Sequence, residues 1–555
     1  MIALTNHVTN HENNSLTTEN VITIEQGKEP VTEQKYEGAV TEPQSSDIQL
    51  EHQNEAKATA TELHSEEARP TRKNESNDNF TETEMHQIEE EHETFLHFNE
   101  RGYLQRVSDL CLAVLYSNHR EIVFLPQEER FYRYISQTGK WEKFAIELLE
   151  KDVTDFSNRF FNSMGLTVAN QKLGHQMMLK VIAVLKTRVS DENFFEETPE
   201  VEALHWFHYA NCMVEFNMET KSWEEKPFSP KYRSRESLPI RYDSTVVPRR
   251  FITELIEPAM NEDDRAVLQQ YAGQCLLGTN ESQKVLVMTG TPNGGKGTLV
   301  EIIRKMVGTK YCAELRLDHS DTRFETSHYV GKSLLVAGDV GSDFLMRKTS
   351  ERLKAYVGGD PLNYEFKCAK GFGEITGNFN VIITSNHTLQ VRLEEDFGAW
   401  ERRLIWIRYQ NPPPAVIIRH FDELLIKEEG SGIANWMMEG AAKIILNGGH
   451  IDLLPAQKER IQLLLDESSP CKLFARDYII EDENATITMR ELWNDYNAVR
   501  EGRDFPGLRR KDFTRLIKDE IDLQFHRVPR NDISRAKGKQ QGYKGLRFNP
   551  SGLIK

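Results

Sequence analysis

Residues 284–306 read KVLVMTGTPNGGKGTLVEIIRKM and decide the fold of this chain. The apolar run at 284–288 predicts a buried strand, and the apolar spacing after Leu299 predicts an amphipathic helix. Between them, residues 290–298 have the form G-x-x-x-x-G-K, in which glycine-rich backbone wraps phosphate groups at a helix N-terminus. A strand, this loop and a helix in that order predict an α/β core of the P-loop NTPase class.

The loop residues have separate expected roles toward ATP. Lys296 is expected to reach the β- and γ-phosphates. Gly297 stands where Ser or Thr usually follows the lysine, so Thr298, one place later, is expected to help hold Mg²⁺. The predicted nucleotide contacts are Gly290, Thr291, Pro292, Asn293, Gly294, Gly295, Lys296, Gly297 and Thr298.

Two later apolar segments end in polar residues of the kind that such a core uses. Residues 333–337 predict a second strand, followed by Asp339, and residues 380–384 predict a third, followed by Asn386. An acid beside the phosphate loop can hold Mg²⁺ or orient water. An amide at the neighbouring strand end can bind the attacking water and the γ-phosphate. We therefore expect Asp339, with Asp343 as a possible substitute, to hold Mg²⁺ or orient water, and Asn386 to bind the attacking water and the γ-phosphate.

An arginine pair, Arg402 and Arg403, precedes a further apolar strand that starts at Leu404. Such a pair is well placed to reach the nucleotide of a neighbouring subunit. The alternative is a surface salt bridge.

These segments together resemble superfamily 3 helicases, and more narrowly the helicase part of phage and plasmid primase-helicases of the P4 phage and poxvirus D5 type. The resemblance is specific over 248–409 and weaker over 95–243. It rests on residues 268–273, 277–278, 290–298, 334–339, 353–360, 382–386 and 396–403.

The resemblance implies an AAA+-like ATPase that assembles as a ring, usually of six subunits, and moves DNA through its pore in the 3′→5′ direction. It implies phosphate binding by Lys296, the motif B acid at Asp339, the sensor at Asn386 and a trans-acting arginine finger at Arg402 or Arg403. It also implies a DNA-gripping hairpin with strands at 362–366 and 374–376. Lys367 and Lys370 would lie near its tip, and ordinary solvated lysines are an alternative of nearly equal weight.

The first 93 residues hold 6 Lys and Arg against 21 Asp and Glu, so they account for most of the net charge of −17. Few apolar residues occur there, which predicts disorder. The expected organisation is a disordered acidic tail over 1–94, a mainly helical domain over 95–247, the ATPase domain over 248–450 and a winged-helix-like domain over 451–555.

The C-terminal segment has the pattern of a winged helix with a basic surface. Thr488 and Glu491 form a capping-box pattern that opens a helix, a second helix is expected at 510–521, and strands are expected at 523–528 and 543–548. Residues 503–555 hold 14 Lys and Arg against 6 Asp and Glu, which favours contact with DNA phosphates over the alternative of a solvated surface. The expected DNA contacts are Arg530, Arg535, Lys537 and Lys539.

Several classes of protein are excluded by composition. No apolar run approaches the roughly 20 residues of a membrane span. The first 20 residues are polar and have no secretory leader pattern. The six cysteines lie far apart, which argues against a disulfide scaffold and fits a reducing compartment, expected to be the cytoplasm of a bacterial host.

The favoured interpretation is an ATP-hydrolysing DNA helicase in replication initiation of a phage, satellite or plasmid. Its expected partners are single- and double-stranded DNA, further copies of itself, and a separate primase or host replication proteins. We expect no primase activity, because residues 95–247 contain no convincing paired-acid and His arrangement. A small-molecule P-loop kinase and an ATP-switched DNA-binding regulator are the alternatives.

Overall fold

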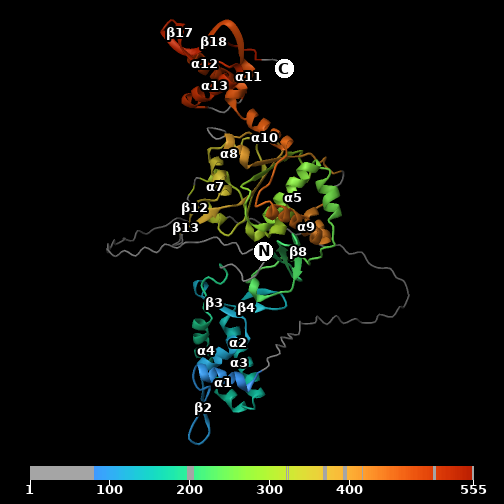
Figure 1. Cartoon of the computed structure of the whole chain (residues 1–555), viewed down its shortest axis with the longest axis vertical. Helices are drawn as coiled ribbons and strands as arrows, with labels where there is room; N and C mark the ends of the chain where they lie inside the picture. The colour runs from blue at the N-terminus through green and yellow to red at the C-terminus, as the bar shows by residue number, and fades with distance from the viewer. Residues whose placement is uncertain are drawn as a thin grey trace, which may run out of the picture. The chain divides into compact units, whose positions relative to one another are not determined.

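The computed structural model describes residues 80–196, 205–320, 322, 324–366, 372–391, 397–414, 417–503 and 508–552. The chain is a mixed α/β protein built around one parallel five-stranded sheet (Figure 1). None of the helices in these ranges combines the length and the apolar character that a membrane crossing requires.

The parallel sheet has the strand order β10-β11-β14-β9-β15. Its strands are β9 (Val285–Gly290), β10 (Cys312–Glu314), β11 (Leu334–Val340), β14 (Asn380–Ser385) and β15 (Leu404–Tyr409). Because all neighbouring pairs are parallel, the carboxyl ends of β9, β11 and β14 meet at one edge. The three strands predicted at 284–288, 333–337 and 380–384 are confirmed.

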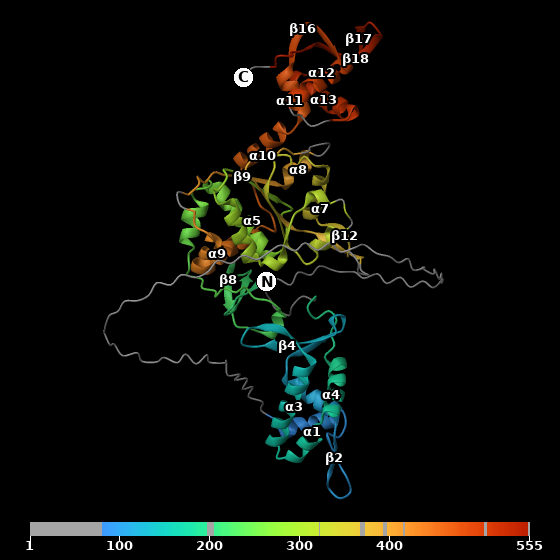
Figure 2. The same ribbon diagram turned by 180° about the vertical axis from the view of Figure 1, so that it is seen from behind.

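Among the described residues, the same part of the chain has five α-helices: α5 (Glu262–Leu277), α6 (Lys296–Val307), α7 (Arg352–Gly358), α8 (Phe397–Arg403) and α9 (Phe421–Leu446). Figures 1 and 2 show α5 and α9 together on one side of the sheet and α7 on the other. Glycines let α5 and α9 approach closely, since a Cβ on Gly440 would lie 1.9 Å from the carbonyl oxygen of Gln269.

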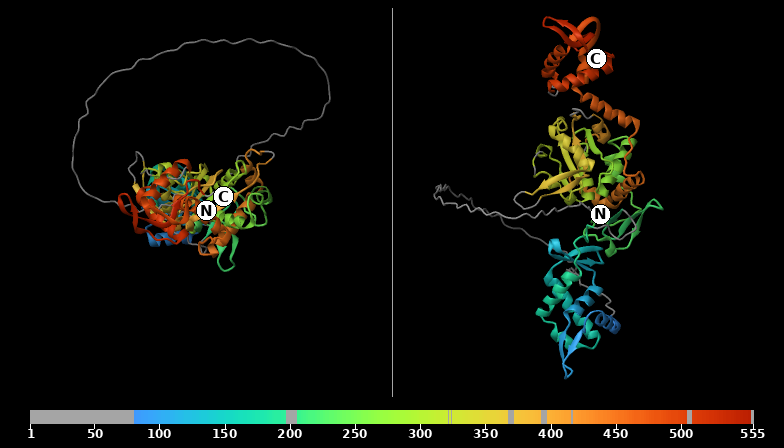
Figure 3. Two further views of the ribbon diagram at one scale, coloured as in Figure 1. Left: turned by 90° about the horizontal axis from the view of Figure 1, so that it is seen from above. Right: turned by 60° about the vertical axis from the view of Figure 1, so that its left-hand side comes forward.

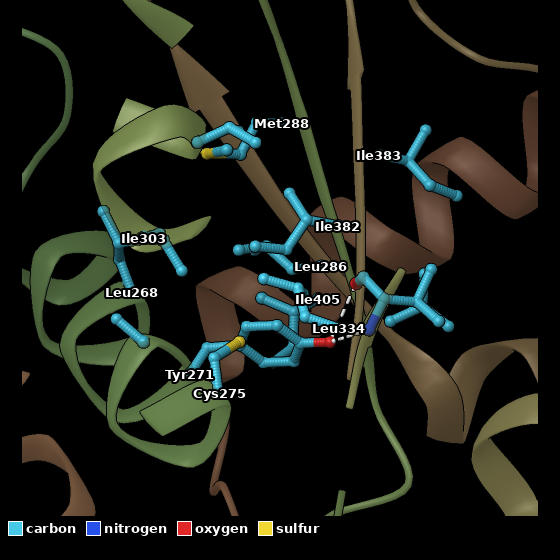
Figure 4. Close-up of a cluster of buried hydrophobic side chains, with 14 of the residues drawn as sticks. Leu268, Tyr271, Cys275, Leu286, Met288, Ile303, Leu334, Ile382, Ile383 and Ile405 are labelled. Atoms are coloured by element: carbon cyan, nitrogen blue, oxygen red, sulfur yellow. Dashed lines mark hydrogen bonds between the residues drawn. The ribbon is translucent and has the colours of Figure 1, made fainter. Parts of the chain in front are cut away.

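A buried tyrosine joins α5 to the sheet (Figure 4). The Tyr271 hydroxyl lies 2.8 Å from the carbonyl oxygen and 2.9 Å from the amide nitrogen of Val381, and 3.1 Å from the carbonyl oxygen of Lys284. It therefore supplies polar partners at the start of both β9 and β14. Around it, Leu268 and Ile382 belong to one continuous hydrophobic core.

The helix α1 (Glu82–Glu91) lies inside the segment that was expected to be disordered, so that expectation is wrong for these residues. Thr81 caps the first turn by accepting a hydrogen bond from the Glu84 amide, and the side chain of Ile88 is buried. Glu84 also contacts His119 at 2.8 Å. Residues 1–79 of the expected tail lie outside the described residues.

The part that follows is mixed rather than mainly helical, which corrects the prediction for 95–247. Its helices are α2 (Asp109–His119), α3 (Ile146–Ser163) and α4 (His175–Arg188). Its strands form three small antiparallel sheets: β1 (Leu96–Phe98) with β2 (Leu104–Val107); β3 (Ile122–Leu125), β4 (Arg130–Ile135) and β5 (Lys140–Phe144); and β6 (Trp206–His208), β7 (Met213–Asn217) and β8 (Ser222–Lys226). Strands this short carry little periodicity, which is why most of them were missed.

The hydrophobic core of the parallel sheet continues across the domain boundaries expected at residues 248 and 450. Phe207 and Tyr242, before residue 248, belong to the same hydrophobic core as the parallel sheet. So does Ile461 on α10 (Pro455–Glu467), after residue 450. The hairpin strands β12 (Asp360–Glu365) and β13 (Phe372–Gly377) pair as predicted, whereas Lys367 and Lys370 lie outside the described residues.

Figure 3 draws the C-terminal part in orange and red as helices with a small sheet. This part has its own hydrophobic core. Its elements are α11 (Pro470–Tyr478), β16 (Ile479–Thr488), α12 (Met489–Arg503), α13 (Arg510–Phe525), β17 (Arg530–Arg535) and β18 (Gly538–Phe548), with sheet order β16-β18-β17. The capping box is confirmed, because Thr488 and Glu491 exchange hydrogen bonds of 2.8 and 3.2 Å. The strand expected at 523–528 is wrong: Ile517, Ile521 and Phe525 recur every four residues, and the helix continues to Phe525.

Replacing Tyr271 by Phe tests the link between α5 and the sheet. The change leaves buried main-chain groups of Val381 and Lys284 without their partner, so we expect a loss of about 1–3 kcal/mol in unfolding free energy. Urea unfolding measures it. Tyr209→Phe is the matched control, because the Tyr209 hydroxyl is equally buried but donates only to the Met438 sulfur, a weak acceptor. Equal losses in the two variants would contradict the bridging role.

Candidate functional site

The loop between β9 and α6 is held against the segment that follows β15. A Cβ on Gly290 would lie 1.6 Å from the carbonyl oxygen of Tyr409, and one on Gly294 would lie 2.6 Å from that of Asn411. Thr291 donates from its hydroxyl to the same Asn411 carbonyl at 2.9 Å. Glycine is therefore required at these two positions because the two backbones are in contact.

The second half of the loop turns through left-handed backbone. Asn293 has φ 60° and Gly295 has φ 98°, a conformation that Asn and Gly adopt most readily. A Cβ on Gly295 would lie 2.7 Å from Leu255 Cδ1, in a π-helical turn at 251–256. The Tyr409 hydroxyl donates to the Leu255 carbonyl at 2.8 Å, so this turn and the end of β15 brace the loop together.

Lys296, the first residue of α6, folds its side chain back under the loop. Its Nζ donates to the carbonyl oxygens of Gly290 (2.9 Å) and Thr291 (2.8 Å) and to Asn386 Oδ1 (3.0 Å). Burial lowers the pKa of the Lys296 ammonium, and the Asp339 carboxylate opposes that effect. The positive charge thus lies where the loop and the ends of two other strands meet.

Asn386 joins this lysine to the acid at the end of β11. Its Nδ2 donates to Asp339 Oδ1, while its Oδ1 accepts from Lys296. The structure therefore brings together three residues that the sequence placed after three different strands. The Asp339 carboxylate is exposed at the sheet edge, and Thr298 is half-buried in the first turn of α6.

The site fits an anion with a divalent cation better than a metal held by protein alone. Within the described ranges, no three His, Cys, Asp or Glu side chains gather as a metal cage. Mg²⁺ typically takes one or two carboxylates and completes its shell with phosphate and water. The glycine cradle (the loop at 290–295), Lys296 and the exposed Asp339 carboxylate match that pattern.

The chain also changes direction here. The connection after β9 runs through α6 toward β10, whereas the connection after β14 runs through α8 to β15 on the other side of β9. In open α/β sheets, ligands bind in the crevice outside the carboxyl ends of strands at such a switch point.

Arg402 and Arg403 lie at the amino end of the parallel strands, opposite the end that carries the loop. They end α8, and the next residue, Leu404, pairs with Val285 at the start of β9. The six residues of β9 separate this edge from the loop by about 17–20 Å. Neither arginine is therefore near Lys296 of the same chain.

The two arginines differ in exposure, which the sequence could not show. Arg402 is exposed, and its carbonyl accepts a 2.6 Å hydrogen bond from Lys284. Arg403 is 7% exposed and donates to the Ala399 carbonyl at 3.2 Å. A polar cavity of ≈ 260 Å³ opens beside them, lined by Ser282, Gln283, Lys284, Arg402, Arg403, His450, Ile451 and Asp452.

Two of the expected DNA contacts in the C-terminal part have internal partners. Arg535 donates to both carboxylate oxygens of Glu491 at 2.8 Å, which lowers the pKa of Glu491 to about 2. Arg530 pairs with Asp532 at 2.9 Å. Lys537 and Lys539 are exposed at the β17–β18 turn. Whether any of the four contacts DNA stays a prediction.

A basic stretch on α13 was missed from the sequence. The first nine residues of the helix hold four basic residues and one acid, whereas the last seven hold three acids and no base. This order opposes the helix dipole, which favours acids near the N-terminus and bases near the C-terminus. Counting charge over 503–555 found the excess but not its position. The basic residues are Arg510, Lys511, Arg515 and Lys518.

Comparison with known proteins adds little to this geometry. A family model described as "Family of unknown function (DUF5906)" matches residues 288–403. No curated protein matches the chain. Among solved structures, the chain is similar to two apo forms of the C-terminal region of NrS-1, each 13% identical, with TM-scores of 0.39 and 0.38. The matched regions cover 79% and 80% of this chain and 100% of each solved chain. TM-scores this low do not establish a shared fold.

A pair of glycine variants tests whether the loop is held as described. Gly290→Ala places a methyl group against the Tyr409 carbonyl, so we expect a loss of about 1–3 kcal/mol or more in stability. Gly297→Ala is the control, because nothing lies within 4 Å of its Cβ and alanine is favoured in a helix by roughly 0.5–1 kcal/mol. Thermal unfolding compares the two. A neutral Gly290→Ala would refute the close approach.

Proposed function

We propose that this chain is an ATP-dependent DNA helicase that forms a ring and acts in the replication of a phage, satellite or plasmid. The observation that carries the proposal is the hydrogen-bonded set of Lys296, Asn386 and Asp339 beside a glycine cradle. Phosphate charge, a divalent cation and an attacking water each have a matching group in this set.

ATP with Mg²⁺ would supply the phosphoanhydride bond whose hydrolysis drives movement. The protein's own residues do the rest. Lys296 neutralises phosphate charge, and loop amides from 290–298 donate to phosphate oxygens. Asp339, with help from Thr298, holds the cation or orients water. Asn386 already accepts a hydrogen bond from Lys296 and donates one to Asp339, so it is placed to respond when phosphate binds beside them.

The position of the arginines supports an assembly of several subunits. Because Arg402 lies at the edge opposite the loop, it can serve a nucleotide only if that nucleotide belongs to another subunit. An arginine that neutralises developing phosphate charge contributes strongly to hydrolysis. The exposed Arg402 suits this role, whereas the buried Arg403 suits an internal structural one.

DNA contact rests on two surfaces in this proposal. The hairpin β12–β13 presents Phe372, whose side chain is 77% exposed, and an exposed aromatic ring can stack on a base. The basic N-terminal part of α13 and the lysines of the β17–β18 turn would contact the phosphates of duplex DNA.

Mixed assemblies of two inactive variants test the trans role. Lys296→Ala should lose hydrolysis because its own site is damaged, and Arg402→Ala because it cannot serve a neighbour's site. A mixture of the two should regain activity, since some interfaces then combine an intact loop with an intact arginine. Steady-state ATP turnover against mixing ratio measures this.

Two outcomes would contradict the trans role of Arg402. If Arg402→Ala keeps wild-type turnover, the finger lies elsewhere. If both variants are inactive and mixing restores nothing although mixed assemblies form, the arginine does not act between subunits.

Replacing Lys511 by Ala tests the α13 surface. Losing one phosphate contact should weaken duplex binding for all sequences and reduce the slope of log affinity against log salt by about 1. Arg530→Ala removes one charge from the same part, but Arg530 is paired with Asp532, so a smaller effect is expected. Fluorescence anisotropy over a salt series measures both. If Arg530→Ala shows the larger change, the β17–β18 hairpin, and not α13, is the main DNA surface.

A further inference from the structure

The end of β11 contains a bulge that sets the direction of Asp339. Ala337 pairs with Ile383 and Val340 pairs with Ser385, so two residues of β11, Gly338 and Asp339, face a single residue of β14. Bulges of this kind occur next to active sites, where they re-aim a side chain. Asp339 has φ 51°, the left-handed region that non-glycine residues seldom occupy.

The residue opposite the bulge is Thr384. Its hydroxyl oxygen accepts a 3.1 Å hydrogen bond from the Asp339 amide, which has lost its regular position in the ladder. Thr384 is 5% exposed, and its backbone pairs with Met288 on β9 at the other side. The threonine is therefore fixed independently of the bulge that it holds.

The next residue holds the other end of the bulge. The fully buried Ser385 donates from its hydroxyl to the Val340 carbonyl at 2.7 Å. The same oxygen accepts from the His387 amide at 3.0 Å. Two consecutive hydroxyls on β14 thus replace ladder hydrogen bonds on both sides of Asp339.

We propose that Thr384 is a positioning residue: its hydroxyl holds Asp339 in the left-handed conformation that directs the carboxylate to Asn386 and to the cation site. The cation part of this inference rests on the proposed function. The hydroxyl is needed because a side chain of the same shape without it leaves the Asp339 amide unpaired beside β14. The bulge then loses the contact that selects its strained conformation.

Amide exchange tests the bond without reference to activity. In the full-length apo protein, we expect the Asp339 amide to exchange with deuterium about ten-fold faster in Thr384→Val than in wild type, because the accepting oxygen is gone. Thr384→Ser keeps that oxygen and should restore slow exchange. Equal exchange in wild type and Thr384→Val would overturn the proposal. The proposal also fails if Thr384→Val speeds exchange at all protected amides alike, because that pattern reports lost global stability and not the loss of one hydrogen bond.

The Mg²⁺ dependence of nucleotide binding tests whether the position of Asp339 serves to bind the cation. With a fluorescent ATP analogue as the probe, Thr384→Val should need roughly 10-fold more Mg²⁺ for the same binding, as supporting residues of metal ligands typically do, while binding in EDTA stays unchanged. In an Asp339→Asn background, the same change should add less than about two-fold, because the ligand is already lost. An additive effect would mean that Thr384 acts on stability alone.

The two proposals fail in different ways. If the wild-type protein shows no Mg²⁺-dependent binding of the ATP analogue, the proposed function is wrong, and amide exchange alone still decides whether Thr384 holds the bulge. If wild type binds the analogue with Mg²⁺ and Thr384→Val is indistinguishable from it, only the positioning role is wrong.

Discussion

The ammonium of Lys296, bound to two loop carbonyls and to Asn386, is the interaction on which the rest of the site depends. A partly buried cation needs such partners, and they come from separate segments. Only the parallel order β11-β14-β9 puts the ends of these three strands side by side. At the amino ends of the strands, the Tyr271 hydroxyl links β9 to β14 through Lys284 and Val381.

The two ends of the parallel strands carry different chemical groups. The carboxyl edge holds the groups that could bind and polarise phosphate, whereas the other edge holds an exposed arginine and a polar cavity. Under the proposed function, these are two halves of one site, which can meet only between subunits. This separation gives a physical reason for assembly: hydrolysis in one subunit would report on the position of its neighbour, which a ring motor requires.

Much of the central sheet could be predicted because its strands are long apolar runs that end in polar residues, as at Asp339 and Asn386. The contact between those residues follows from parallel strand ends. The sequence could not show that Arg403 is buried and Arg402 exposed, or that Arg535 is paired with Glu491, since both depend on tertiary packing. The short strands β6–β8 were missed because segments of such length show little periodicity. The helix α1 was missed because its sequence has few apolar residues.

The central claim is that the Lys296 site hydrolyses ATP to move DNA. It is tested most directly by ATP turnover with and without single-stranded DNA, for wild type and Lys296→Ala, with particle mass measured on the same samples. The account predicts turnover that DNA stimulates, in a species of several subunits, and that Lys296→Ala abolishes. Turnover that is independent of DNA, in a species with the mass of one chain, would contradict it.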